Sequence, residues 1–193
     1  MTAIRQLEIP SLGYALLGLL QPKPASGYDV RKIFSSTSMK TYSDSPGAIY
    51  PALRRLEKQG LIRGTIEESR GLRRRQVFQL TPRGLSELKK WVTRPITAED
   101  LTHGYEEIML RFAFSETAAG ASASVEFLRS LQAAVKEHVD SLHREYEASH
   151  NFMPTSGRLA FESGVRATEC LLQWTEYAIA AFEKEARQKG SES

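Results

Sequence analysis

Apolar residues recur at helical spacing through the first sixty positions of the chain. In residues 11–21 the apolar side chains fall on one helical face, which predicts an amphipathic helix. Residues 22–25 contain two prolines that end it. A second helix is expected over 26–37, with Ser26 as its N-cap. A third is expected over 46–59, and Gly60 stands where a helix-terminating glycine is favoured.

After Gly60 the hydrophobic period changes from helical to alternating. Residues 61–69 and 74–80 are rich in β-branched and aromatic residues, around a turn that contains Gly71, which predicts a β-hairpin. The hairpin tip is basic, with arginines at 70, 73, 74 and 75. A fourth helix follows over 81–92. Three helices, a hairpin and a further helix form the order of a winged helix, whose third helix enters the major groove and whose hairpin, the wing, contacts the DNA backbone or minor groove.

The second half of the chain is predicted to be entirely helical. Residues 105–114 form one expected helix, and a long helix is expected from about 118 to 149. In the long helix a coiled-coil-like row steps by three and four residues, broken only by Gln132. The row comprises Val125, Leu128, Gln132, Val135, Val139, Leu142 and Tyr146. Pro154 and Gly157 then separate it from a last helix over 157–188.

The apolar stripe of these last helices is wide for so short a stretch of chain. We therefore expect a second subunit to cover part of it, although packing against the first domain is an alternative. The expected interface residues are Val135, Val139, Leu142, Leu171, Trp174, Ile179 and Phe182. The predicted fold is mainly α with a small β-hairpin wing: a winged helix-turn-helix domain over 1–95 and an α-helical dimerisation domain over 96–193.

Charge divides along the same line. Residues 1–95 contain 17 Lys and Arg against 7 Asp and Glu, whereas residues 96–193 contain 9 against 16. The net charge of +3 for all 193 residues hides this division. A basic first half suits a polyanion, most simply double-stranded DNA. A solvated basic face without a partner is the alternative.

The third helix has two different faces when its residues are advanced by about 100° each. Ile49, Leu53 and Leu56 cluster on the side expected to be buried. Arg54 and Lys58 lie opposite, with Pro51 in the first turn, where a missing N–H costs little. Tyr50 lies on the flank at the N-terminal end, where it can donate to a phosphate or lie against a base or sugar. A half-buried structural role for Tyr50 remains the alternative.

Other positions complete the predicted DNA-binding set. Ser45 and Gly47 stand at the start of the third helix, whose free N–H groups and positive end suit a phosphate. Lys32 ends the second helix and is expected to contact a phosphate. The wing arginines are expected to bind the DNA backbone. The full set is Lys32, Ser45, Gly47, Tyr50, Arg54, Arg73, Arg74 and Arg75.

Three segments taken together resemble the PadR family of bacterial transcriptional regulators: "ALLGLLQPKPASGYDVRKIF", "SPGAIYPALRRLEKQGLI" and "QVFQLTPRGLSELKKWV". The resemblance implies a homodimeric winged-helix repressor that binds a short inverted-repeat operator. It also implies that a small aromatic or cationic effector releases the DNA in some members. Tyr42 and Phe78 replace residues more common in the family, and the wing lacks a proline that many relatives carry.

An effector site is predicted from aromatic residues alone. Trp174 and Tyr177 in the last helix and Trp91 near the domain junction are the candidates for lining a cavity at the dimer interface. Aromatic residues at helical spacing also serve simply as core, and no motif identifies the ligand.

Other classes of function fit the sequence less well. A winged helix that binds protein, with the second domain as scaffold, is the main alternative to an operator-binding regulator. An enzyme is not expected, since the four histidines lack metal-ligand spacing and Cys170 has no evident histidine partner. We expect no metal or cofactor. One cysteine and no signal or membrane segment favour the cytoplasm.

Overall fold

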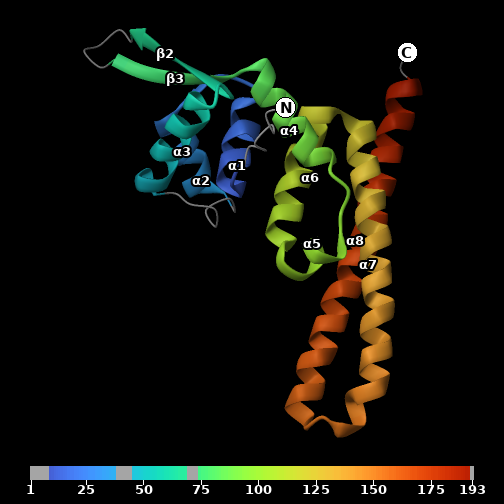
Figure 1. The fold of residues 1–193 in the computed structure, drawn as a ribbon. Helices are drawn as coiled ribbons and strands as arrows, with labels where there is room; N and C mark the ends of the chain where they lie inside the picture. Colours follow the sequence, from blue (N-terminus) through green and yellow to red (C-terminus); the bar gives the residue numbers. More distant parts are fainter. Residues whose placement is uncertain (1–8, 38–44, 69–73, 192–193) are drawn as a thin grey trace, which may run out of the picture. The chain divides into compact units, whose positions relative to one another are not determined.

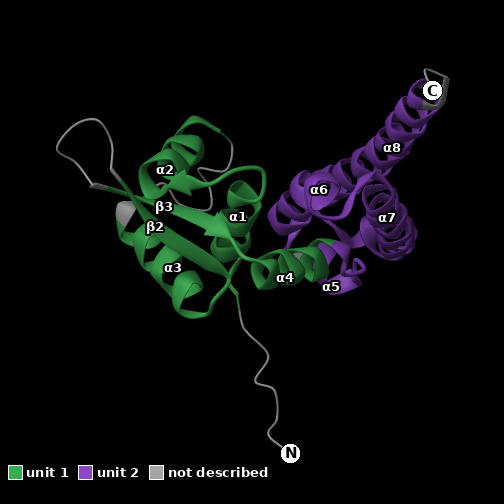
Figure 2. Ribbon diagram, turned by 90° about the horizontal axis from the view of Figure 1, so that it is seen from above, with its two compact units in different colours: residues 1–92 green, residues 93–193 purple. Residues whose placement is uncertain are grey.

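The computed structural model describes residues 9–37, 45–68 and 74–191. The chain divides into two compact units, Met1–Val92 and Thr93–Ser193 (Figure 2). The sequence placed the domain boundary a few residues later, after residue 95. Among the described helices, none is both long and apolar enough to span a bilayer.

The first unit has the element order of a winged helix (Figure 1). Its elements are α1 Ser11–Leu20, β1 Ala25–Ser26, α2 Gly27–Ser36, α3 Pro46–Lys58, β2 Ile62–Glu68, β3 Arg74–Leu80 and α4 Pro82–Thr93. The three strands are antiparallel in the order β1-β3-β2. The mainly helical class, the hairpin and the four helices predicted for this part are thereby confirmed.

The two-residue strand β1 was not predicted. Ala25 pairs with Phe78 and Ser26 with Val77, so β1 lies on the outer side of the wing strand β3. A strand this short has no alternation that a sequence pattern could show. It nevertheless joins the start of α2 to the wing.

Buried apolar side chains line the interior of the first unit. They come from every helix of the unit and from the start of the hairpin. The fully buried members are Leu16, Leu17, Val30, Phe34, Ile49, Leu53, Leu61 and Leu88. Burying a side chain of this size stabilises the fold by about 1.5–3 kcal/mol.

Gly60 ends α3 as the sequence predicted. Its φ of 73° is in the left-handed region that favours glycine. The Gly60 N–H donates to the Glu57 carbonyl at 2.9 Å, and the Leu61 N–H donates to the Leu56 carbonyl at 3.0 Å. These two bonds form a Schellman motif, which stops the helix and directs the chain into β2.

The described secondary structure of the second unit consists of helices alone. Its elements are α5 Ala98–His103, α6 Tyr105–Ala119, α7 Ala121–Ser149, the short 3-10 helix η2 His150–Phe152 and α8 Thr155–Ser191. Figure 1 shows α7 and α8 as two long neighbouring helices joined at η2. The helix α5 was not predicted, although Thr97 and Asp100 form a capping box at its start.

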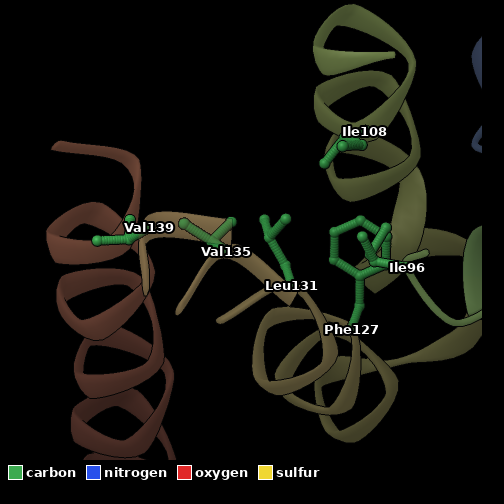
Figure 3. Close-up of a cluster of buried hydrophobic side chains, with 6 residues drawn as sticks. All are labelled: Ile96, Ile108, Phe127, Leu131, Val135 and Val139. Atoms are coloured by element: carbon green, nitrogen blue, oxygen red, sulfur yellow. The ribbon is translucent and has the colours of Figure 1, made fainter. Parts of the chain in front are cut away.

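The core of this unit corrects the predicted row along α7. The buried side chains are Ile96, Ile108, Phe127, Leu131, Val135 and Val139 (Figure 3). Leu131 is fully buried, whereas Gln132 and Val125 are only partly covered. The reason is that α6 packs on the first part of α7, where the buried Ser115 and Ser124 hydroxyls lie 2.6 Å apart. Gln132 therefore does not interrupt the core, because the core passes through Leu131.

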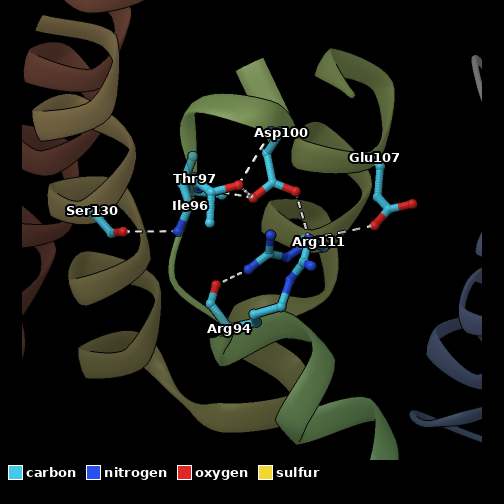
Figure 4. Close-up of polar contacts among 7 residues, drawn as sticks. All are labelled: Arg94, Ile96, Thr97, Asp100, Glu107, Arg111 and Ser130. Carbon is cyan, nitrogen blue, oxygen red and sulfur yellow. Dashed lines mark hydrogen bonds and ion pairs between the residues drawn. The ribbon is translucent and has the colours of Figure 1, made fainter. Parts of the chain in front are cut away.

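A buried arginine fixes the segment before α5 (Figure 4). The Arg111 side chain is fully buried, donates to the Arg94 carbonyl and lies 5.1 Å from the Phe127 ring centroid. Burial, together with the nearby Arg94 charge, lowers the pKa of Arg111 to about 10, against the raising influence of Asp100 and Glu107. Arg111 therefore remains charged at neutral pH.

Replacing Gly84 by alanine tests the packing of α4. A Cβ at Gly84 would lie 2.0 Å from the Leu61 carbonyl oxygen, which is backbone and cannot rotate away. We expect Gly84→Ala to lower the free energy of unfolding by about 1–3 kcal/mol, measured by denaturant unfolding.

Gly164 supplies the matched control, because a Cβ there meets nothing within 4 Å. Gly164→Ala should leave stability unchanged or raise it by up to about 1 kcal/mol, since alanine is the better helix former. Equal effects of the two substitutions would show that α4 does not pack this closely on Leu61.

Candidate nucleic-acid interface

The third helix of the first unit separates a buried face from a basic one. Ile49 and Leu53 are fully buried and Leu56 is nearly so. Arg54 and Lys58 are exposed on the other side, as the helical projection predicted. Burial of the apolar face thus fixes the direction in which the two cations project.

The start of α3 differs from the expectation in one respect. The helix begins at Pro46, so Pro51 lies inside it rather than in its first turn. Pro51 has no N–H, and the i→i−4 hydrogen bond to the Gly47 carbonyl is therefore not formed. The predicted explanation for Pro51 was wrong because Pro51 is the sixth residue of the helix, beyond the first turn.

The N-terminal N–H groups of α3 are already engaged. The Ser45 hydroxyl oxygen accepts the Gly47 N–H at 3.2 Å, and the Ser45 carbonyl accepts the Ala48 and Ile49 N–H groups at 3.0 and 3.1 Å. A phosphate at this helix end would have to take over the Ser45 cap. The geometry therefore gives Ser45 and Gly47 a capping role first.

Tyr50 lies against the N-terminus of α2. A Cβ on Gly27 would come within 2.6 Å of the Tyr50 Cε1 atom, so only glycine leaves room for the ring. The Tyr50 side chain remains 42% exposed. Tyr50 is consequently supported on one side and open to solvent on the other.

The exposed face of α2 adds residues that the sequence did not single out. Tyr28 is 61% exposed, and the Arg31 guanidinium lies 5.7 Å from its ring centroid. Lys32, which was predicted, is exposed beside them. The signal available was the i, i+3 spacing of an aromatic and a cationic residue on a helix surface.

The wing arginines are described only in part. Arg73 lies outside the described residues, and of Arg74 only the backbone is described, as the first residue of β3. Arg75 is described in full, and its guanidinium donates to the Asp29 carboxylate at the start of α2. No sequence pattern indicated this pair, whose members are 46 positions apart.

Asp29 is held as a carboxylate by its neighbours. Partial burial alone would raise its pKa, but hydrogen bonds from the Ser26 N–H and hydroxyl, together with the Arg75 charge, lower the pKa of Asp29 overall. Both Ser26 bonds measure 2.9 Å. The group is therefore ionised at neutral pH and able to pair with Arg75.

The three predicted effector residues lie in different surroundings. Trp91 is 7% exposed and stacks on Tyr14 within the first unit, with ring centroids 4.3 Å apart. Tyr177 is 74% exposed. Trp174 lines a cavity of about 660 Å³ in the second unit. The cavity is otherwise lined by Leu101, Tyr105, Met109, His138, Ala167, Thr168, Cys170 and Leu171.

The predicted interface residues fall into two groups. Val135 and Val139 are buried within their own unit, so they are core residues there. The other five are only partly covered: Leu142, Leu171, Trp174, Ile179 and Phe182. Within the described residues, no group of three or more His, Cys, Asp and Glu side chains could hold a metal ion.

The first unit is a winged helix-turn-helix domain, as its strand order and its basic third helix define. Residues 16–90 match the model of the transcriptional regulator PadR-like family. By its description, this family consists of transcriptional regulators.

One relative is the negative transcriptional regulator PadR of Bacillus subtilis (strain 168), which is 33% identical over 127 residues. The match spans 63% of this chain and 65% of that protein, somewhat less than two thirds of the relative's length.

Solved structures of PadR proteins are also similar. Bacillus subtilis PadR in complex with operator DNA matches with a TM-score of 0.44 and 23% identity, over 91% of this chain and 99% of that chain. The same protein in complex with p-coumaric acid matches with a TM-score of 0.38, again at 23% identity, over 90% and 99%.

Proposed function

We propose that this protein is a homodimeric, sequence-specific DNA-binding transcriptional regulator that acts as a repressor. The observation that carries the proposal is the division of α3 into a fully buried apolar face and an exposed face with Tyr50, Arg54 and Lys58. In a winged helix this is the element that enters the major groove.

The exposed residues of α3 have the chemistry for two kinds of contact. An arginine in the major groove donates two parallel hydrogen bonds to guanine O6 and N7, so Arg54 supplies base selection. Tyr50 is supported by the backbone at Gly27, so its hydroxyl and ring meet a phosphate or sugar in a fixed position. Lys58 adds charge near the C-terminal end of α3.

Positioning on the duplex comes from the elements beside α3. Phosphate contacts are proposed for two residues of α2, Arg31 and Lys32, and for two residues of the wing, Arg73 and Arg74. Such contacts supply affinity that depends on salt and carries no sequence preference. The excess of cations in residues 1–95 is the charge that these contacts require.

Repression is the proposed direction of regulation, and it is supported by the relative in Bacillus subtilis, which is a negative regulator. A dimer that covers promoter DNA excludes polymerase without any further activity. A regulator of this kind works where the chromosome is, in the cytoplasm.

The dimer is proposed to form through the second unit. The helix α8 has 37 residues and carries partly covered apolar side chains at Leu171, Trp174 and Ile179, with Leu142 of α7 on the neighbouring helix. Side chains that are half covered within one chain gain stability when a second copy covers the rest. The two α3 helices of such a dimer would reach half-sites roughly 34 Å apart.

The effector is proposed to bind in the cavity that Trp174 lines. Its volume, about 660 Å³, suits a small aromatic molecule, and most of its wall is apolar. His138 and Thr168 offer polar contacts within it. Binding there would favour one arrangement of α7 and α8 over another, and release of DNA would follow from that shift.

Arg54→Ala should weaken binding to operator DNA more than binding to random DNA. We expect a loss of about 1–3 kcal/mol on a selected operator and a smaller loss on a scrambled duplex, measured by fluorescence anisotropy. Arg83→Ala is the control. Arg83 lies beside Gly60, just past the C-terminal end of α3, and its replacement removes the same charge.

Equal losses on both duplexes would reduce Arg54 to a phosphate contact. If the unmodified protein itself shows no preference among sequences, the protein-binding alternative replaces the operator-binding proposal.

Ile179→Glu should dissociate the dimer, because it places a charge among apolar side chains that the partner covers. Sedimentation velocity should then show a monomer, whereas Gln173→Glu, at an exposed position on the same helix, should leave a dimer. A dimer that survives Ile179→Glu would exclude this part of α8 from the interface.

Cavity binding can be followed through Trp174 after Trp91→Phe removes the other tryptophan. The first probe would be p-coumaric acid, which is named for the Bacillus subtilis relative. We expect quenching of Trp174 that Ala167→Phe abolishes by filling the cavity. Quenching that is insensitive to Ala167→Phe would place the effector elsewhere.

A further inference from the structure

We infer that the Asp29–Arg75 pair is a latch that positions the wing, and that Arg75 acts through Asp29 rather than as a phosphate contact. The inference rests on the proposed DNA-binding function and deepens it. It separates Arg75 from Arg73 and Arg74, with which the sequence grouped it.

Three donors converge on one carboxylate oxygen of Asp29. The Asp29 Oδ2 atom accepts the Ser26 N–H and the Ser26 hydroxyl, each at 2.9 Å, and also the Arg75 Nη2 group. The Asp29 N–H in turn donates to the Ser26 hydroxyl oxygen at 3.3 Å. Arg75 is therefore bound to a carboxylate whose own position is fixed by the capping box of α2.

The same site is connected to the hairpin through the backbone of β1 and β3. Ser26 of β1 pairs with Val77 of β3, two residues beyond Arg75 on the same strand. The start of α2 is thus attached to β3 twice, through the backbone at Ser26 and through the side chain of Arg75. Two attachments along one strand restrain its direction, whereas one would allow it to pivot.

Arg75 lies near the end of the described hairpin pairing. Glu67 lies across from Arg75, and the register ends one pair later at Glu68 and Arg74. A restraint at this point acts on the last described pairs of the hairpin. The side chains of Arg75 and Asp29 are 49% and 37% exposed, so the pair can be altered without opening the core.

Tyr50 lies against the same turn of α2 that holds the Asp29–Arg75 pair. Gly27, between Ser26 and Tyr28, is the residue against which the Tyr50 ring lies. The same turn of α2 therefore contacts both the aromatic residue of α3 and the strand β3 of the wing. Loosening Asp29 or Arg75 would separate contacts that must meet one DNA duplex together.

The test is a double-mutant cycle of Asp29→Asn and Arg75→Gln on operator affinity and its salt dependence. Asparagine keeps an acceptor for Ser26 but loses the charge that binds Arg75. We expect each single variant and the double variant to lose the same factor, about fivefold, since all three remove one exposed ion pair. The slope of log affinity against log salt should be unchanged.

Glu67→Gln is the matched control, because it removes an equal charge from the strand opposite Arg75. It should leave operator affinity the same or slightly higher. The opposite result would be that Asp29→Asn strengthens binding, as Glu67→Gln would, and that Arg75→Gln reduces the slope of log affinity against log salt by about 0.9. Arg75 would then be a phosphate contact, and the latch would be refuted.

A measurement without DNA separates this inference from the proposed function. Hydrogen exchange of the β3 amides should rise equally in Asp29→Asn, Arg75→Gln and the double variant, and should not rise in Glu67→Gln. Additive effects, or none, would overturn the latch even if operator binding is confirmed. An unmodified protein that binds no operator would refute the proposed function, while the exchange data would still decide whether the latch exists.

Discussion

The capping box of α2 is the interaction on which the proposed interface depends. Ser26 and Asp29 satisfy each other's hydrogen bonds at the point where β1 becomes α2. The same turn pairs with β3, receives Arg75 and makes room for Tyr50 at Gly27. Three elements that would face one duplex are therefore positioned from a single helix terminus, and each depends on the local geometry of the others.

The second unit depends on a different kind of constraint. Arg111 is an arginine without exposed surface that binds the Arg94 carbonyl and lies over Phe127. Burying its charge is costly, and the acidic groups at Asp100 and Glu107 offset part of the cost. Residues 94–97 are consequently fixed to α6 and α7, where Ser130 also accepts the Ile96 N–H at 3.0 Å. The cavity that Trp174 of α8 lines belongs to the same unit.

Much of the fold could be predicted from periodicity and helix-end chemistry. Most of the helices, the hairpin and the terminating role of Gly60 follow from local rules that act within a few residues, although α5 was missed despite the capping box at its start. What could not be predicted depends on contacts between distant segments. The two-residue strand β1 exists only because β3 is beside it, and Leu131 replaces Gln132 in the core because α6 packs there. The sequence suggested that Arg75 belongs with Arg73 and Arg74, yet its carboxylate partner is 46 positions away.

The most direct test of the central claim is fluorescence anisotropy with DNA taken from upstream of the gene that encodes this protein, against a scrambled duplex, at two salt concentrations. We predict a preference of roughly a thousandfold or more for the native sequence, with affinity that falls as salt rises. Equal and weak binding to both duplexes, followed by failure to enrich any sequence from a random pool, would contradict the account and leave the winged helix as a surface for another partner.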